Sequence, residues 1–196
     1  MTNQNKYPLI SGNLSLDLVN TEVIRHGNRL DLLLSEQDLI EWIHTLKVNT
    51  THSFWQDELF LKINDEKKKV LSSIRNMRDI LRENFEVIAD KGIISGDFVS
   101  YLEKKVEKAP FTYKFVNESL IPCPVGEIDD IILSFISFDV LTLIEQNELN
   151  KMKRCANEEC VLLFIDQSGR RKWCSMKICG NRKKVKRFQQ KNENDL

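Results

Sequence analysis

The chain has 196 residues, of which 41% are hydrophobic and 30% are charged, with 29 lysines and arginines against 29 aspartates and glutamates. This is the composition of an ordinary soluble globular protein, and a net charge of zero argues against a protein that binds a polyanion with its whole surface. No apolar run reaches the roughly 18–20 residues that cross a bilayer, and the first residues carry neither the basic nor the apolar region of a signal peptide, which predicts a cytoplasmic protein without membrane contact.

The first predicted elements lie in residues 14–31. Residues 14–21 begin by alternating apolar and polar side chains, which predicts a short strand, and the polar stretch that follows predicts a loop. Asn20, Arg25 and Asp31 are candidate ligand-binding residues because amide and guanidinium groups close behind a strand can hold an anionic or polar effector. A surface loop in which Arg25 pairs with a nearby acid explains the same residues.

Helices are predicted over the next part of the chain. Ser35, with Asp38 three residues later, begins a helix as a capping pattern. Apolar residues at helical spacing predict the longest helix over residues 64–90, closed by Gly92, and a further helix over residues 95–108.

Residues 111–115 alternate strictly and predict a strand that pairs with the strand beginning at residue 14. The prolines on both sides of Cys123 exclude a helix there, whereas residues 127–147 are rich in Ile, Leu and Phe and predict a buried helix. The fold class predicted for the N-terminal region is therefore α+β, mostly helical with a small β-sheet.

The charge balance changes after residue 150. Residues 151–191 hold 13 basic and 3 acidic side chains, a net charge of +10, whereas residues 1–150 hold 16 basic and 24 acidic side chains, a net charge of −8. The sequence therefore predicts an acidic domain at residues 1–150 and a small basic domain at residues 151–196. The short junction contains no Gly/Ser linker, so we expect the basic domain to pack against the acidic one.

Four of the five cysteines lie in the basic segment, in the pattern Cys155-x4-Cys160-x13-Cys174-x4-Cys179. Two close pairs on either side of a short spacer can surround one ion with four sulfurs, and zinc suits such a closed tetrahedral site. We predict one structural Zn²⁺ per chain, because a cytoplasmic setting disfavours disulfides and so short a segment needs a metal to complete its core. Free cysteines or two disulfides are the alternatives.

The residues around the cysteines fit a treble-clef or ribbon-like zinc finger. Residues 161–166 predict a strand, residues 171–173 a returning strand, and the residues after Cys179 a basic helix. We expect the basic side chains near the turn and on that helix to contact nucleic-acid phosphates. They are Arg170, Arg171, Lys172, Arg182, Lys183, Lys186 and Arg187. Docking of this basic face on the acidic domain, or a solvated surface, are the competing interpretations.

Residues 154–185 resemble the CGNR zinc-finger family, which includes the tetrad Cys-Gly-Asn-Arg found here at residues 179–182. The N-terminal region is similar to the ABATE domain in residues 16–21, Arg25, Gly27, residues 31–33 and the helix with Leu39 and Trp42. The resemblance implies a bacterial stress-related transcription regulator or RNA-binding protein, whose finger contacts nucleic acid and whose N-terminal domain senses a small ligand.

No Ser-His-Asp order, phosphate-binding glycine loop, HExxH motif or carboxylate pair occurs, so the chain is predicted not to be an enzyme. We therefore expect a zinc-dependent regulator that binds DNA in preference to RNA, with a small-molecule effector and a homodimer as further partners. The alternative is a ligand-binding or enzymatic N-terminal domain whose finger serves only stability or dimerisation.

Overall fold

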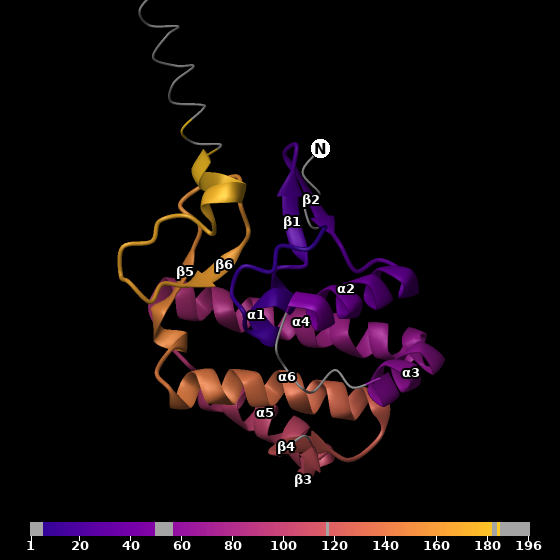
Figure 1. Cartoon of the computed structure of the whole chain (residues 1–196). Coiled ribbons are helices and arrows are strands. Elements are labelled where there is room, and N and C mark those ends of the chain that lie inside the picture. The colour runs from indigo at the N-terminus through magenta and orange to yellow at the C-terminus, as the bar shows by residue number, and fades with distance from the viewer. Residues whose placement is uncertain (1–5, 50–56, 117, 182–183, 185–196) are drawn as a thin grey trace, which may run out of the picture.

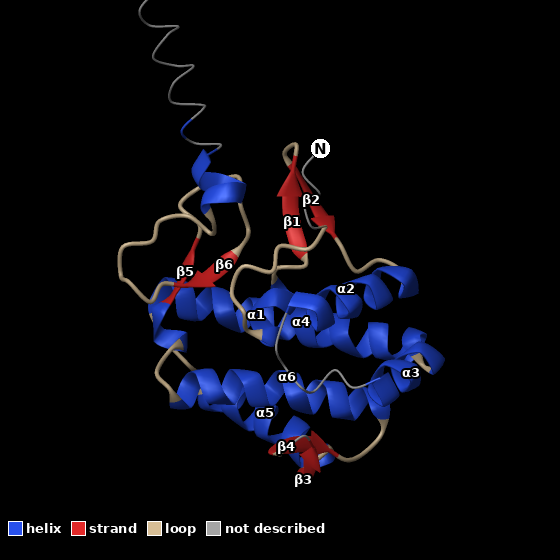
Figure 2. Cartoon of the chain, viewed as in Figure 1, coloured by secondary structure: helices blue, strands red, loops and turns tan. Residues whose placement is uncertain are grey.

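The computed structural model describes residues 6–49, 57–116, 118–181 and 184. Helices make up the larger part of it, and three separate two-stranded antiparallel sheets lie at its margins (Figures 1 and 2). Within these ranges no helix has the length and apolar character of a membrane span. The predicted α+β class is confirmed. We call the described residues up to 150 the body and residues 151–181 the finger.

The helices and strands alternate along the chain without a repeat. The body contains α1 (Leu14–Val19), β1 (Glu22–Arg25), β2 (Asn28–Asp31), α2 (Glu36–Asn49), α3 (Asp57–Asp65), α4 (Lys67–Lys91), α5 (Gly96–Lys108), β3 (Phe111–Val116), β4 (Ser119–Pro124) and α6 (Ile128–Glu145). A 3-10 turn at Leu149–Lys151 leads into the finger, which contains β5 (Met152–Arg154), β6 (Leu163–Ile165) and a wide helical turn at Met176–Gly180.

The predicted helices are confirmed, and their ends follow from local chemistry. Before α2, the side chains of Ser35 and Asp38 each bond the other residue's backbone N–H, at 3.2 and 2.8 Å. Gly92 ends α4 with a left-handed backbone (φ 69°), from which its N–H donates to the carbonyl of Ile88 at 2.8 Å. Ser95 caps α5 by accepting from the N–H of Phe98.

One hydrophobic core joins the body and the finger. Helix α4 contacts α1, α2 and α6 in the body and β5 and β6 in the finger. Trp42 and Phe85 of the body and Phe164 of the finger are fully buried and belong to this same core. The expectation that the C-terminal segment packs against the rest of the chain is therefore confirmed.

The segment predicted as a strand from residue 14 is instead helix α1. All of Ser15 to Val19 is buried, so the alternation of apolar and polar residues does not separate a core face from a solvent face. The two polar side chains have partners inside the protein. Ser15 donates to the carboxylate of Asp139, and Asp17 accepts from Ser11 at 2.7 Å.

Two further predictions about strands are wrong. The segment predicted as a loop after α1 is a hairpin of β1 and β2, in which His26 and Gly27 both have positive φ angles, 52° and 79°, as a tight two-residue hairpin turn requires. Strand β3 pairs with β4 rather than with the segment at residue 14. Neighbouring strands joined by a short turn lose less chain entropy on pairing than strands about 100 residues apart.

Asp17 provides a testable pH dependence. Its buried carboxylate accepts hydrogen bonds from the N–H groups of Ile10 and Ser11 and from the Ser11 hydroxyl. Burial raises its pKa to about 6. The pKa is thus above that of the unfolded chain, so the stability that this site contributes is complete below about pH 4 and is lost as the pH rises to 6.

We expect Asp17→Asn, which keeps the accepting oxygen but cannot ionise, to remove this loss. At pH 7 the variant should be more stable than the wild type by up to about 3 kcal/mol, and at pH 4 the two should be nearly equal. Urea unfolding at both pH values measures the difference. A difference that does not change with pH would show that Asp17 does not titrate in this way.

Candidate metal centre and nucleic-acid interface

Three separate parts of the finger bring the four predicted cysteines together. Cys155 follows β5, Cys160 lies in the loop before β6, Cys174 follows the loop after β6, and Cys179 lies in the wide helical turn. Their four sulfur atoms all lie within 4.8 Å of one another. Cys155, Cys174 and Cys179 are buried and Cys160 is half-buried. The fifth cysteine, Cys123, is on β4 and takes no part in this group.

The spacing of the sulfurs fits a tetrahedral zinc site. A Zn–S bond of about 2.3 Å requires sulfurs about 3.8 Å apart on each edge of the tetrahedron. The Sγ atoms of Cys160 and Cys174 are 3.8 Å apart. Four cysteine sulfurs with no oxygen ligand are a donor set that selects zinc among the common divalent cations. The group is therefore a single structural zinc site.

Other polar groups are directed at these sulfurs. The backbone N–H of Cys174 donates to the sulfur of Cys155 at 3.4 Å, and the side-chain amide of Asn157 donates to that of Cys179 at 3.5 Å. Hydrogen bonds from Cys160 and the other thiols hold the pKa of Cys155 far below its ordinary value. Such groups orient the ligands and stabilise thiolates, the form in which cysteine binds zinc.

The strands of the finger differ in part from the prediction. Strand β6 lies within the predicted 161–166 segment, but its partner is β5, at the start of the finger, and residues 171–173 form no strand. Asp166 explains the difference, because its carboxylate accepts from the N–H of Arg171 at 3.1 Å and from the hydroxyl of Ser168 at 3.0 Å. These bonds curl the chain after β6 into a compact loop instead of a hairpin.

The finger is held to the body by hydrogen bonds between buried groups. The side-chain amide of Asn20 donates to the carbonyl of Leu163 and accepts from the N–H of the same residue, both at 3.0 Å. Arg82 of α4 donates to the carbonyl of Val161 at 3.1 Å. At the surface, Arg154 forms ion pairs with Asp90 at 2.7 Å and Glu86 at 3.2 Å.

The predicted effector residues are each bound within the protein. Asn20 is buried against Leu163, and Arg25 donates to the backbone carbonyl of Lys6 at 2.9 Å. Asp31 forms a two-pronged ion pair with Arg78 at 2.6 and 2.7 Å. Burial alone would raise the pKa of Asp31, but these bonds hold it below its ordinary value. The three side chains do not line a common cavity, and effector binding stays a prediction.

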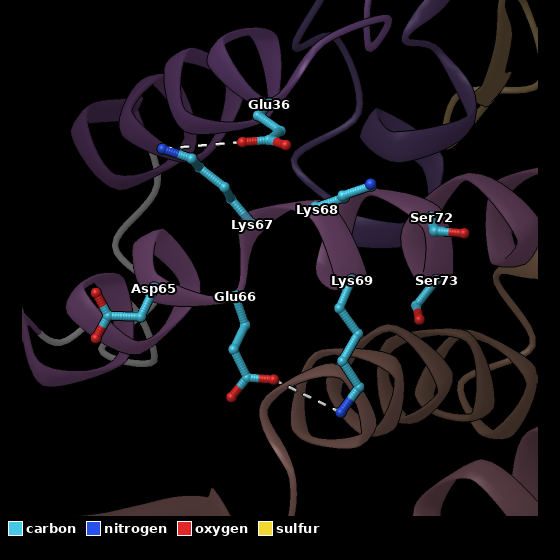
Figure 3. A pocket seen from close by; sticks show the side chains of 8 residues that line it. All are labelled: Glu36, Asp65, Glu66, Lys67, Lys68, Lys69, Ser72 and Ser73. Carbon is cyan, nitrogen blue, oxygen red and sulfur yellow. Dashed lines mark ion pairs between the residues drawn. The ribbon is translucent and has the colours of Figure 1, made fainter.

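A pocket of about 610 Å³ lies elsewhere in the body, where the start of α4 meets α2 and α3 (Figure 3). Its lysines already face acids, since Lys67 lies 3.9 Å from Glu36 and Lys69 lies 3.6 Å from Glu66. No pair of Asn20, Arg25 or Asp31 lines it. We therefore do not assign the effector to this pocket.

Sequence reasoning missed the two buried arginines of α4. Arg78 and Arg82 are 2% and 6% exposed, and their carboxylate partners, Asp31 and Glu22, lie at the base of the β1–β2 hairpin. Arg82 also contacts the finger, so one side chain links the hairpin, α4 and β6. The available signal was their position, because both arginines fall beside Ile74, Met77, Leu81 and Phe85 on the apolar face of the helix.

The predicted nucleic-acid residues divide into three groups. Arg170 and Lys172 are exposed, whereas Arg171 is half-buried, with its guanidinium 4.4 Å from the ring centre of Phe164. Lys177 and Lys184, which were not predicted, are exposed beside the metal site. The remaining predicted residues lie outside the described part of the chain: Arg182, Lys183, Lys186 and Arg187.

Docking on acidic groups accounts for other basic residues at the start of the finger. Lys151 pairs with Glu148 and Lys153 with Asp166, both at 2.8 Å, in addition to the pairing of Arg154 with the body. The hydrogen bond from Lys153 holds the pKa of Asp166 well below its ordinary value. The basic charge of the finger is therefore partly neutralised near the body and exposed near the metal site.

The comparisons with known proteins agree with the geometry of the metal site. No curated protein matches the chain. The resemblance of the N-terminal region to the ABATE domain stays a prediction. Residues 151–192 match the family model of the CGNR zinc finger, and this match contains all four cysteines that form the metal site.

Proposed function

We propose that the protein binds nucleic acid, DNA in preference to RNA, through the basic surface of its zinc finger and regulates transcription. The observation that carries this proposal is the group of exposed cations beside the metal site. Arg170, Lys172 and Lys177 are exposed, and none of them forms an ion pair with another described residue. We name these three side chains the free basic group.

The contrast between the two ends of the finger supports this proposal. If the positive charge of the finger served only to attach it to the acidic body, the cations far from the body would have no purpose in that contact. The cation that does attach it, Arg154, lies at the junction with α4, whereas the free basic group belongs to the loop and helical turn around the cysteines. The finger projects from one end of the helical body (Figure 1).

The charge of the metal-loaded finger is suited to a polyanion. Four thiolates and one Zn²⁺ contribute about −2. Added to the net +10 of residues 151–191, this leaves a clear positive excess. Contacts with about four to six phosphates would give a log-log salt slope of roughly −3 to −5. Zinc acts in this proposal by fixing the loops that carry the cations, so the protein binds its target and catalyses no reaction.

The free basic group provides the direct test. Fluorescence anisotropy with a generic 20-bp DNA duplex should show binding by the zinc-loaded protein at low salt. We expect the triple variant Arg170→Ala, Lys172→Ala and Lys177→Ala to bind roughly ten- to a hundredfold more weakly and to reduce the salt slope by about 2 to 3, because up to three phosphate contacts are lost.

A matched control removes three exposed lysines from the body. Lys68, Lys104 and Lys108 are exposed, lie on α4 and α5, and change the net charge by the same amount when replaced with alanine. This variant should keep nearly the affinity of the wild type. Equal losses in both variants would show only a general charge effect, and no binding by the wild type at low salt would exclude the proposal. Titrations with single-stranded DNA and duplex RNA measure the preference between nucleic acids.

A further inference from the structure

The hairpin of β3 and β4 exposes an apolar face at the end of the body away from the finger (Figure 1). Phe115 is 75% exposed, and Leu120, directly opposite on β4, is 63% exposed. Tyr113, two residues before Phe115 and so on the same face, is 65% exposed. Three large apolar side chains on one face of a two-stranded sheet are unusual in a protein that functions alone.

This face continues onto helix α6. Phe111 is on the same side of β3, and its ring lies 5.3 Å from that of Phe135 and 4.8 Å from that of Phe138, centre to centre. Phe138 itself is 45% exposed. The apolar surface therefore consists of Tyr113, Phe115, Leu120 and Phe138, and we call it the hairpin face. Its base is anchored in the body, so it is a fixed surface rather than the side of an isolated hairpin.

The edge of β4 is unsuited to adding another strand. Pro122 and Pro124 occupy alternate positions on it, and proline in an edge strand removes the N–H donors that face outward. The two nearest charged residues of the hairpin, Lys114 and Glu118, have opposite signs. The surface thus has no excess charge that would favour a nucleic acid or an anionic membrane, and its contact must be made by the apolar face.

We propose that two copies of this chain pair through the hairpin face. Aromatic side chains have areas of about 150–250 Å², so the observed exposures amount to roughly 500 Å² of apolar surface in each copy. A symmetric pair would bury about twice this area, which reaches the 1,000 Å² typical of the smallest specific interfaces. An apolar face with balanced charges beside it is self-complementary, as a two-fold axis requires.

The geometry of the pair leaves both fingers available. The hairpin face and the finger lie at opposite ends of the body (Figures 1 and 2), so two copies joined at their hairpins would carry one finger at each end. The pairing stands on the exposed aromatic residues alone and does not depend on nucleic-acid binding. Its failure and the failure of the proposed function are therefore distinguishable.

Light scattering coupled to size-exclusion chromatography tests the pairing at about 10–100 µM protein. We expect the wild type to have twice the chain mass of 22.9 kDa. The variant Phe115→Asp should weaken the dimer at least about thirtyfold, because it places a charge at the centre of the apolar contact. Leu61→Asp is the matched control, since Leu61 is 64% exposed on α3 and its replacement should leave the dimer intact.

The folding of each variant is checked by circular dichroism and by zinc content, both of which should equal those of the wild type. If Phe115→Asp fails this check, the milder variant Phe115→Ser is measured in the same way. A wild type that remains monomeric at the highest concentration overturns the proposal. A dimer that survives in a folded variant at position 115 also overturns it, because the copies then meet elsewhere.

Discussion

Replacement of Cys174 with serine should remove the bound zinc and destabilise the whole chain, the body included. Binding of zinc to a finger stabilises its fold by on the order of 10–16 kcal/mol, so the finger should unfold without its fourth thiolate. Leu163 and Phe164 of the finger are fully buried in the core that also contains the body helices. Their loss exposes that core, and Asn20 loses both of its partners.

Two measurements separate the effects on the finger and on the body. Elemental analysis should give about one zinc per wild-type chain and much less in the variant after dialysis against a chelator. The circular dichroism of the helices, most of which belong to the body, should show a Tm lower by roughly 10–15 °C, as expected for a loss of about 4 kcal/mol.

Cys123→Ser is the matched control, because Cys123 is a cysteine outside the metal site and is only half-buried. It should retain its zinc and lose little stability. Unchanged zinc content in Cys174→Ser would refute the assignment of the ligands. An unchanged Tm of the helices in a zinc-free variant would show that the body is stable without the finger.

Replacement of Arg82 with methionine is expected to lower the free energy of unfolding by about 3–5 kcal/mol. The guanidinium forms an ion pair with Glu22 at 2.5 Å and donates to the carbonyls of Val19 and Val161. Burial lowers the pKa of Arg82, and the nearby charge of Glu22 opposes this effect. Methionine fills a similar volume but leaves the Glu22 carboxylate and two carbonyls without their partner, and that desolvation carries the cost.

Arg75→Met is the control on the same helix. Arg75 is exposed and lies 3.5 Å from Asp31, which has its main partner in Arg78, so this replacement should cost less than about 1 kcal/mol. Urea unfolding of both variants at pH 7 gives the comparison. Equal losses would show that the buried position of Arg82 has no special role.

The sequence predicted those features that depend on residues close together in the chain. The metal site followed from the two short cysteine spacings, since each pair needs only one local turn to place both sulfurs on the same ion. The long helix followed from a period that repeats from Val70 to Ile88, and its end from Gly92, whose left-handed conformation is local. Ser35 with Asp38, and Ser95, similarly determine where helices begin.

The sequence could not predict features that depend on distant partners. The polar residues of α1 are stable in the interior only because Asp139, more than 100 residues away, accepts from Ser15. The structural roles of Asn20 and Arg82 depend in the same way on carbonyl groups of the finger. The β1–β2 hairpin had a weak local signal in His26 and Gly27, because histidine and glycine both tolerate positive φ angles better than most residues.

The contact between Asn20 and Leu163 distributes the tolerance to mutation unequally between its two sides. On the finger it uses only the backbone N–H and C=O of residue 163, which are present whatever side chain stands there. On the body it needs one side chain of this length that both donates and accepts; aspartate lacks the donor and glutamine is one carbon longer. Residue 163 can therefore change to other apolar residues of similar size while the attachment is kept, whereas almost any change of Asn20 releases it.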